Sequence, residues 1–190
     1  MSAGKLAAAM IGMAFSNTIE AAQPAIRIVV FDQAGVTGPT LRKASDTARR
    51  MFHVAGIETV WTVCRASVDS EQHCVLPAGE YLQAFVRRNG KGLERTHEGM
   101  GLALIVKGER RVVCYAFVEP AEGLAELAHG SLDVALGSVL AHEVGHLMGL
   151  RHSASGVMKA NFEAYDMIEA ESGRLLFDLG GAKALRAAWR

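Results

Sequence analysis

The sequence AHEVGHLMGLRHSASGVMKANF, residues 141–162, holds three of the chain's seven histidines within eleven positions. They are His142, His146 and His152. His142 and His146 are four residues apart in a stretch of helical character, so their side chains share one face, one turn apart. Two imidazoles on one face can reach a single ion at the roughly 2.0–2.1 Å that zinc prefers. The spacing therefore predicts a pair of metal ligands.

The residues that follow can complete such a site. Zinc sites that do chemistry use three protein ligands and leave a fourth position to water. Gly149 allows the chain to leave the helix in a conformation that other residues resist, so that His152 can turn back toward the same ion. Glu143 lies next to the first histidine and suits a carboxylate that polarises a metal-held water. The alternative, three unrelated surface or helix-packing histidines, is disfavoured because this combined spacing rarely arises by chance.

The remaining sequence predicts strands alternating with helices. Apolar, β-branched runs between turn residues predict five strands, at 25–31, 57–64, 80–88, 101–108 and 110–120. Helical spacing of apolar residues predicts two main helices, at 40–56 and 131–148, and one or two short helices within 165–190. Pro120 is expected to end the fifth strand. Since the first strand, helix and strand form a parallel crossover unit, the predicted class is α/β or α+β with a mostly parallel sheet.

Length and composition indicate a globular chain. The 190 residues fit one domain. Lysine plus arginine equals aspartate plus glutamate, 20 of each, so the formal net charge is zero. This balance gives no support to nucleic-acid binding or to a strongly charged partner. The sequence leaves the oligomeric state open.

The N-terminal segment has the layout of a secretory signal peptide. One lysine is followed by an apolar run at 6–15 and then by small residues before Pro24. The run is shorter than the roughly 20 apolar residues of a membrane span, and no other segment is long and apolar enough. We therefore predict a signal peptide at 1–22, a mature domain at 23–190, and a secreted or otherwise extracytoplasmic protein. The alternative is an N-terminal extension on a cytoplasmic protein.

The three cysteines have different surroundings. Cys64 and Cys74 lie ten residues apart around a polar loop and can close a small disulfide if the protein is exported. Cys114 lies in the apolar run VVCYAFV, where we expect a buried free thiol.

The motif HEVGHLMGLRH, residues 142–152, matches HExxHxxGxxH, and in it the chain resembles the metzincin zinc endopeptidases. The resemblance is closest to matrixin-like members, whose third histidine is commonly followed by serine, as Ser153 follows His152 here. Metzincins also have a tight turn with a methionine beneath the metal, for which Met158 is the candidate. Ordinary core packing is the alternative for Met158.

This resemblance implies a fold and a set of site residues. The fold is an α+β, α/β-like domain with a twisted, mostly parallel five-stranded sheet, an antiparallel edge strand, two main helices and a C-terminal helical subdomain. His142, His146 and His152 would bind one zinc ion. Glu143 would activate the zinc-bound water as general base, and then act as general acid, in hydrolysis of a peptide bond.

The resemblance also implies where a peptide or protein substrate binds. Metzincins hold a peptide in extended form along an antiparallel edge strand, a recognised mode of recognition. Gly101, Leu102, Ala103 and Leu104 are the candidates for that strand. A plain core strand is the alternative for this segment.

Two other functions fit the same residues. One is a catalytically silent or partner-dependent zinc-binding domain, and the other is a zinc amidase that acts on a non-peptide amide. The intact Glu143 favours an enzyme. Two departures from the family pattern stand out: the span from His152 to Met158 is shorter than in typical matrixins, and Ala160 occupies the place of the tyrosine ligand of astacin-like members. The other four histidines are expected to be surface or capping residues: His53, His73, His97 and His129.

Overall fold

The computed structural model describes residues 25–65, 74–93, 99–105 and 112–189. The expected signal peptide at 1–22, and also His73 and His97, lie outside these residues. The elements in chain order are β1 (Ile26–Asp32), α1 (Gly38–Val54), β2 (Thr59–Arg65), β3 (Leu82–Arg87), β4 (Gly101–Ile105), β5 (Val112–Phe117), α2 (Val118–Leu127), α3 (Leu132–Leu147), α4 (Ala164–Glu171) and α5 (Leu179–Ala188). None of the helices in the described part of the chain has the length and apolar character needed to cross a membrane.

The five strands form one mixed sheet in the order β2-β1-β3-β5-β4. β1 pairs in parallel with both β2 and β3, and β3 pairs in parallel with β5. β4 pairs with β5 alone and runs antiparallel to it, with Gly101 opposite Ala116. This confirms the predicted mostly parallel sheet with an antiparallel edge strand. Among the described residues, the outer edge of β4 is unpaired.

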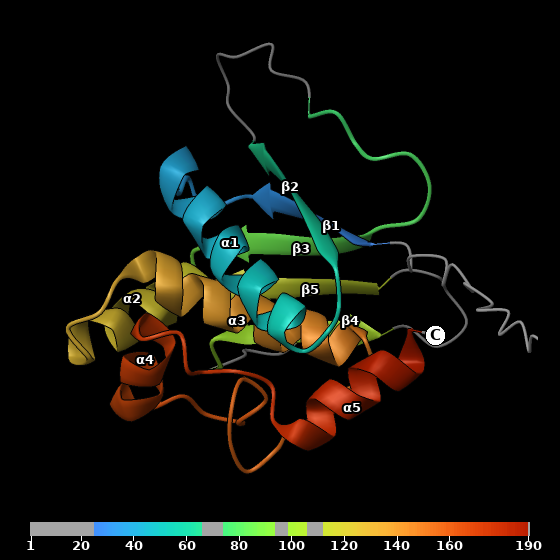
Figure 1. The fold of residues 1–190 in the computed structure, drawn as a ribbon. Coiled ribbons are helices and arrows are strands. Elements are labelled where there is room, and N and C mark those ends of the chain that lie inside the picture. Colours follow the sequence, from blue (N-terminus) through green and yellow to red (C-terminus); the bar gives the residue numbers. More distant parts are fainter. Residues whose placement is uncertain (1–24, 66–73, 94–98, 106–111, 190) are drawn as a thin grey trace, which may run out of the picture.

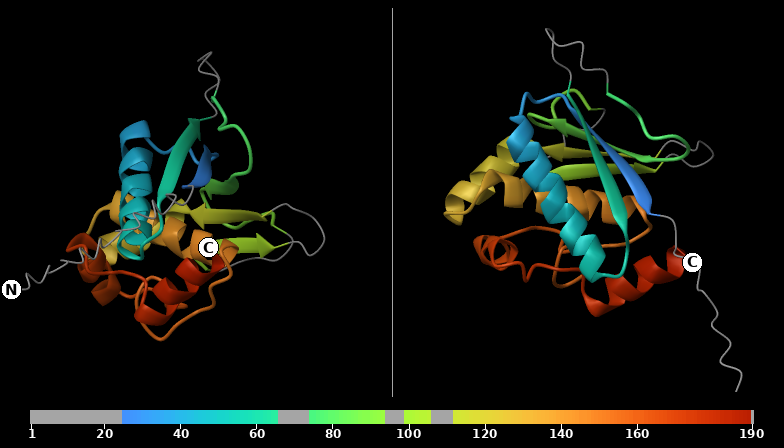
Figure 2. Two further views of the ribbon diagram at one scale, coloured as in Figure 1. Left: turned by 45° about the vertical axis from the view of Figure 1, so that its right-hand side comes forward. Right: turned by 45° about the horizontal axis from the view of Figure 1, so that its top comes forward.

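The two long helices pack on one face of the sheet (Figure 1). Ile28 and Val30 of β1 are fully buried and join Leu41 of α1 in the core beneath them. α1 and α3 approach closely at Gly137, where a Cβ atom would meet the Ala44 carbonyl oxygen at 2.6 Å. The C-terminal helices α4 and α5 lie beyond α3, on the side away from the sheet (Figure 2). α3 is therefore the central element, with the sheet on one side and the C-terminal segment on the other.

One helix was not predicted. We expected the fifth strand to continue to Pro120, but β5 ends at Phe117 and α2 begins at Val118. Pro120 lies in the first turn of α2, where its missing N–H has no intrahelical acceptor to lose. The proline therefore stands inside a helix start and does not mark the end of the strand.

The cysteines have the states that the sequence around them predicted. Cys64 at the end of β2 forms a disulfide with Cys74, and their Cα atoms are 5.2 Å apart. Such a separation is ordinary for a disulfide. Cys114 of β5 is a buried free thiol.

Candidate metal centre

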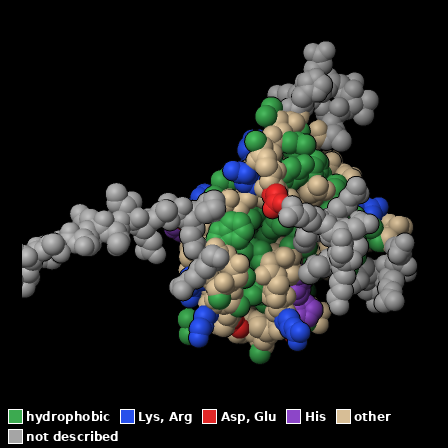
Figure 3. Space-filling view, turned by 90° about the vertical axis from the view of Figure 1, so that its right-hand side faces the viewer, with side chains coloured by type: hydrophobic (Ala, Val, Ile, Leu, Met, Phe, Trp, Pro, Cys, Tyr) green, Lys and Arg blue, Asp and Glu red, His purple; other side chains and the backbone are tan. Residues whose placement is uncertain are grey.

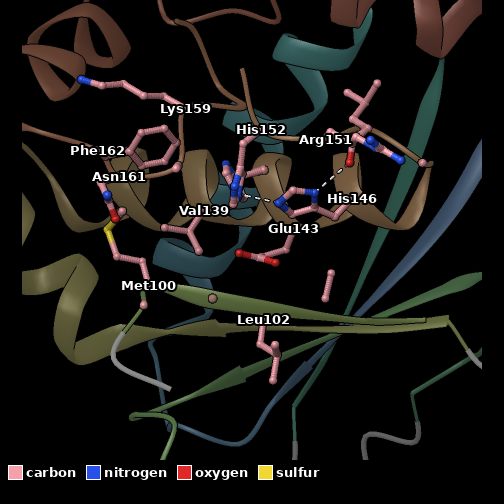
Figure 4. A pocket seen from close by; sticks show the side chains of 17 residues that line it. Met100, Leu102, Val139, Glu143, His146, Arg151, His152, Lys159, Asn161 and Phe162 are labelled. Carbon is pink, nitrogen blue, oxygen red and sulfur yellow. Dashed lines mark hydrogen bonds between the residues drawn. The ribbon is translucent and has the colours of Figure 1, made fainter. Parts of the chain in front are cut away.

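α3 carries three of the candidate site residues at the bottom of a cleft (Figure 4). The helix is buried without interruption from Ala135 to Gly145 because it lies between the sheet and the C-terminal segment. His142 and Glu143 are 7% and 5% exposed, and His146 at the end of the buried stretch is half-buried. Two ligand candidates and the candidate base are therefore fixed by one rigid element.

Backbone carbonyls set the orientation of both helical imidazoles. Nδ1 of His142 lies 2.7 Å from the Val157 carbonyl oxygen, and Nδ1 of His146 lies 2.8 Å from that of Leu150. A carbonyl oxygen only accepts, so each Nδ1 must donate a proton. In the neutral ring, Nε2 is then left with a free lone pair, as a metal ligand requires.

The two free nitrogens face one another. Nε2 of His142 and Nε2 of His146 are 3.0 Å apart. Two lone pairs at this distance are unfavourable unless a proton or a cation lies with them. A tetrahedral ion bonded to both at 2.0–2.1 Å would hold them about 3.3 Å apart, close to the separation observed. The donor set therefore fits a metal ion without rearrangement of the helix.

A tight helix end directs the chain back toward this pair. α3 ends at Leu147, and Gly149 follows with a φ of 89°. The N–H of Gly149 donates to His146, and that of Leu150 donates to Gly145, which together form a Schellman motif. We call residues 149–158 the return loop. It brings His152 to the helical pair, so that one ring nitrogen from each of the three histidines lies within 4.8 Å of the others.

The end of the return loop packs against α3 next to His142. The Ser153 N–H donates to the Met158 carbonyl at 2.8 Å and closes the turn. Met158 is 2% exposed, and its side chain lies against Gly145, where a Cβ atom would meet the Met158 sulfur at 2.7 Å. Gly145 lies three residues after His142, so the two are neighbours on the surface of the helix. The missing side chain of Gly145 thus leaves room for the Met158 side chain against α3.

Burial shifts the protonation of the helical residues in the metal-free chain. Desolvation lowers the pKa of His142 to about 4, with smaller contributions from the neighbouring histidines, and desolvation also lowers the pKa of His146. Both rings are then neutral near pH 7 and can bind a metal. Desolvation raises the pKa of Glu143 to about 8. A nearby dication would oppose that shift, since it favours the charged carboxylate.

The cleft above the site has a volume of about 600 Å³ and runs between β4 and the return loop. Gly101, Leu102 and Ala103 of β4 line one side, whereas Leu104 is exposed and does not line it. Gly101 lies directly against Glu143, because a Cβ atom there would be 2.6 Å from Cγ and 2.7 Å from Cδ of the glutamate. The start of β4 thus covers the candidate base.

The other side of the cleft holds residues that the sequence did not single out. Phe162 packs edge-on against His142, with ring centroids 5.7 Å apart, and Arg151 lies beside His146 (Figure 4). The carbonyls of Val157 and Leu150 were also missed, because no side-chain pattern identifies a backbone acceptor. Resemblance had already made Met158 a candidate, but its contact with Gly145 was missed, and the glycine in HEVGH was the signal that could have indicated it.

The remaining described histidines do not join the site. His53 is exposed and lies 2.7 Å from a Glu58 carboxylate oxygen. His129 is exposed at the end of α2 with a φ of 52°. In the parts of the chain that the structure describes, the three histidines of the site are the one group of three or more side chains able to share a metal ion.

Comparisons with known proteins show a shared fold. No protein-family model matches the chain, and no curated protein matches its sequence. Archaemetzincin from Methanopyrus kandleri is similar with a TM-score of 0.52 and 18% identity, over 86% of this chain and 95% of that one. A zinc-dependent peptidase from Methanocorpusculum labreanum gives a TM-score of 0.53 and 16% identity, over 83% and 99%. At these identities the likeness shows a metzincin-type fold and does not by itself show a shared activity.

Proposed function

We propose that this chain is a zinc-dependent endopeptidase. The observation that carries the proposal is the convergence of two helical imidazoles, both oriented by backbone carbonyls, with a third imidazole from the return loop beside Glu143. Three imidazole nitrogen donors suit zinc, and three protein ligands leave a position for water. The likeness of the fold to two zinc-peptidase structures supports the same conclusion.

Each site residue has a distinct task in this proposal. His142, His146 and His152 would hold one zinc ion, with Met158 as the apolar floor beneath them. When bound, zinc supplies a Lewis acid for the scissile carbonyl and lowers the pKa of a water to about 7. Glu143 takes a proton from the attacking water and later delivers it to the amine nitrogen that leaves when the C–N bond breaks. The carboxylate ends the cycle as it began.

The edge of β4 is proposed as the substrate platform. An extended peptide can pair its main chain with an open strand edge, and such pairing is independent of side chains. β4 borders the cleft directly above Glu143. Pairing over several residues favours cleavage within a chain, and the serine after the third histidine supports a matrixin-like specificity site.

Export of the protein is proposed on two grounds. The N-terminal segment has the order of charged, apolar and small residues of a signal peptide. The disulfide between Cys64 and Cys74 is a bond that persists mainly in oxidising compartments.

Mass spectrometry of a diverse peptide pool tests the activity. The zinc-loaded protein is expected to cut peptides that Glu143→Ala leaves intact, with equal zinc content in the two proteins. Folded, zinc-loaded protein that makes no Glu143-dependent cut would overturn the proposal in favour of a zinc-binding domain without turnover.

A further inference from the structure

The charged side chains that line the cleft include one cation without an acidic partner among the described residues. Among the described residues, the charged side chains of the lining are Glu143, Arg151 and Lys159. Glu143 is buried at the floor. The Lys159 ammonium is already paired, at 2.7 Å with Glu163 and 2.8 Å with Asp166, and it extends away from the histidines (Figure 4). Within the described part of the chain, Arg151 has no hydrogen-bond or ion-pair partner and is exposed, so its guanidinium is the cation of this lining left for a ligand.

The backbone at Arg151 is held in place by the site itself. The N–H of the preceding Leu150 donates to Gly145, and its carbonyl accepts from Nδ1 of His146 at 2.8 Å. The following residue is His152. A long side chain that starts from such a fixed point samples a limited volume beside the histidines. On this face of the molecule, basic side chains lie close to the exposed histidines (Figure 3).

The topology indicates which part of a substrate Arg151 faces. α3 meets the start of β4 at Glu143, one turn before the helix ends, since Glu143 touches Gly101. Its C-terminal end, at Leu147, shares a cavity with Leu82 and Gln83 of β3. Gln83 pairs with Val113, which pairs with Leu104 near the end of β4. α3 and β4 therefore run in the same direction.

A peptide paired antiparallel to β4 would place its N-terminal half toward the end of α3 and Arg151. Antiparallel pairing is slightly more stable per residue than parallel pairing. The C-terminal half would then lie toward Asn161 and Phe162, on the other side of the histidines (Figure 4). That side of the cleft offers no unpaired cation in the described lining.

We infer that Arg151 selects substrates with an acidic side chain on the N-terminal side of the cleaved bond. This inference rests on the proposed peptidase function. The planar guanidinium binds a carboxylate through two parallel N–H donors. A free terminal carboxylate cannot serve in this role, because the substrate's C-terminus lies on the opposite side of the cleaved bond. The ligand is therefore an aspartate or glutamate side chain.

Peptides that differ in one residue test the inference. A sequence cut by the zinc-loaded protein is prepared with glutamate or glutamine at each position on both sides of the bond. A gain of about two- to fivefold in kcat/KM is expected for glutamate at an N-terminal-side position. Arg151→Gln should make kcat/KM equal for the glutamate and glutamine peptides, and Arg151→Glu should make the glutamine peptide the better substrate. Lys43→Gln, an exposed cation on α1 outside the cleft, should preserve it.

Binding provides a readout that does not depend on turnover. Zinc-loaded Glu143→Gln should bind the glutamate peptide more tightly than the glutamine peptide, and the difference should shrink in high salt. Cleavage without any glutamate preference, or a preference that survives Arg151→Gln, overturns the inference and leaves the peptidase proposal intact. Preferential binding with no cleavage by the wild type has the opposite meaning, since the recognition would stand and the proposed activity would fall. A preference only on the C-terminal side would overturn the assigned role of Arg151.

Discussion

The helical and loop halves of the candidate site are built in different ways. His142 and His146 project from a buried helix, and each is held by a hydrogen bond to a backbone carbonyl. His152 comes from the return loop and is exposed. The helix thus fixes two nitrogens 3.0 Å apart before any ion binds, whereas the loop delivers the third. The helix therefore holds the preorganised part of the site, and the buried ionisable side chains, with their desolvation cost, are also on the helix.

Glu143→Gln should give the largest effect on turnover. It replaces the carboxylate proposed as general base with an amide of nearly the same shape. Loss of a general base typically lowers the rate by about 10²- to 10⁴-fold. Zinc content should not change, since the group of side chains able to share the ion consists of the three histidines and does not include Glu143. Turnover of a peptide from the pool and elemental analysis of the protein measure the two quantities. Loss of zinc together with activity would show that Glu143 belongs to the ligand set.

The pH dependence of the zinc-free protein should reveal the cost of burying the glutamate. Burial raises the pKa of Glu143 from 4.5 to about 8, so folding is most favoured below pH 4.5 and loses stability as the pH rises through 8. The loss amounts to roughly 5 kcal/mol at most, at about 1.4 kcal/mol for each unit between 4.5 and 8. Glu143→Gln should lack this slope, and zinc should flatten it in the wild type. Urea unfolding at pH 5 and pH 8.5 compares the two proteins, and equal slopes would contradict the expectation.

Substitutions at two glycines test packing and backbone conformation separately: Gly145 is tightly packed in the helix, and Gly149 has a positive φ in the loop. Gly145→Ala places a methyl group against the Met158 sulfur and Phe177, and such overpacking costs about 1–3 kcal/mol. Gly149 has open space around it, so Gly149→Ala should cost only the strain of its φ of 89°, about 1–2 kcal/mol. Asparagine tolerates that conformation, so Gly149→Asn should be milder than Gly149→Ala, whereas Gly145→Asn should be worse than Gly145→Ala. Thermal unfolding ranks the four variants, and the same order at both positions would show that packing and conformation are not separated as described.

The smallest expected effect is on the stability of the zinc-free protein, where the loop histidine and a helical histidine should differ. His152→Ala should change the stability of the zinc-free protein by no more than about 0.5 kcal/mol, as is usual for an exposed side chain. His142→Ala should cost about 1–3 kcal/mol, because it leaves the Val157 carbonyl without its donor. Both variants should bind zinc more weakly than the wild type. Equal stability losses in zinc-free protein would mean that the loop ligand is as firmly built in as the helical one.

Local patterns were enough to predict the elements of the sheet and the central helix. Apolar runs located all five strands, and the spacing of His142, His146 and Gly149 located α3 and its end. These features depend on residues close together in the chain, which is why the sequence alone reveals them. α2 was missed because Pro120 is equally compatible with a strand end and a first helical turn.

Contacts between distant segments could not be predicted. Gly101 meets Glu143 across 42 positions of sequence, and Met158 meets Gly145 through the return loop. The carbonyls that orient the imidazoles belong to Leu150 and Val157, whose side chains carry no polar group. The sequence therefore indicates the candidate ligands and the candidate base, whereas tertiary packing decides their orientation and protonation.

The open edge of β4 has a consequence for handling the protein. In the described part of the chain, the outer N–H and C=O groups of this strand have no partner strand, and Leu104 beside them is 37% exposed. An unpaired edge is also a template for another copy of the same edge, and many proteins block such edges with lysine, proline or a bulge. The proposed role as a peptide platform requires an open edge, which is incompatible with such blocking. The purified protein should therefore tend to aggregate as its concentration rises, and a saturating extended peptide should protect it.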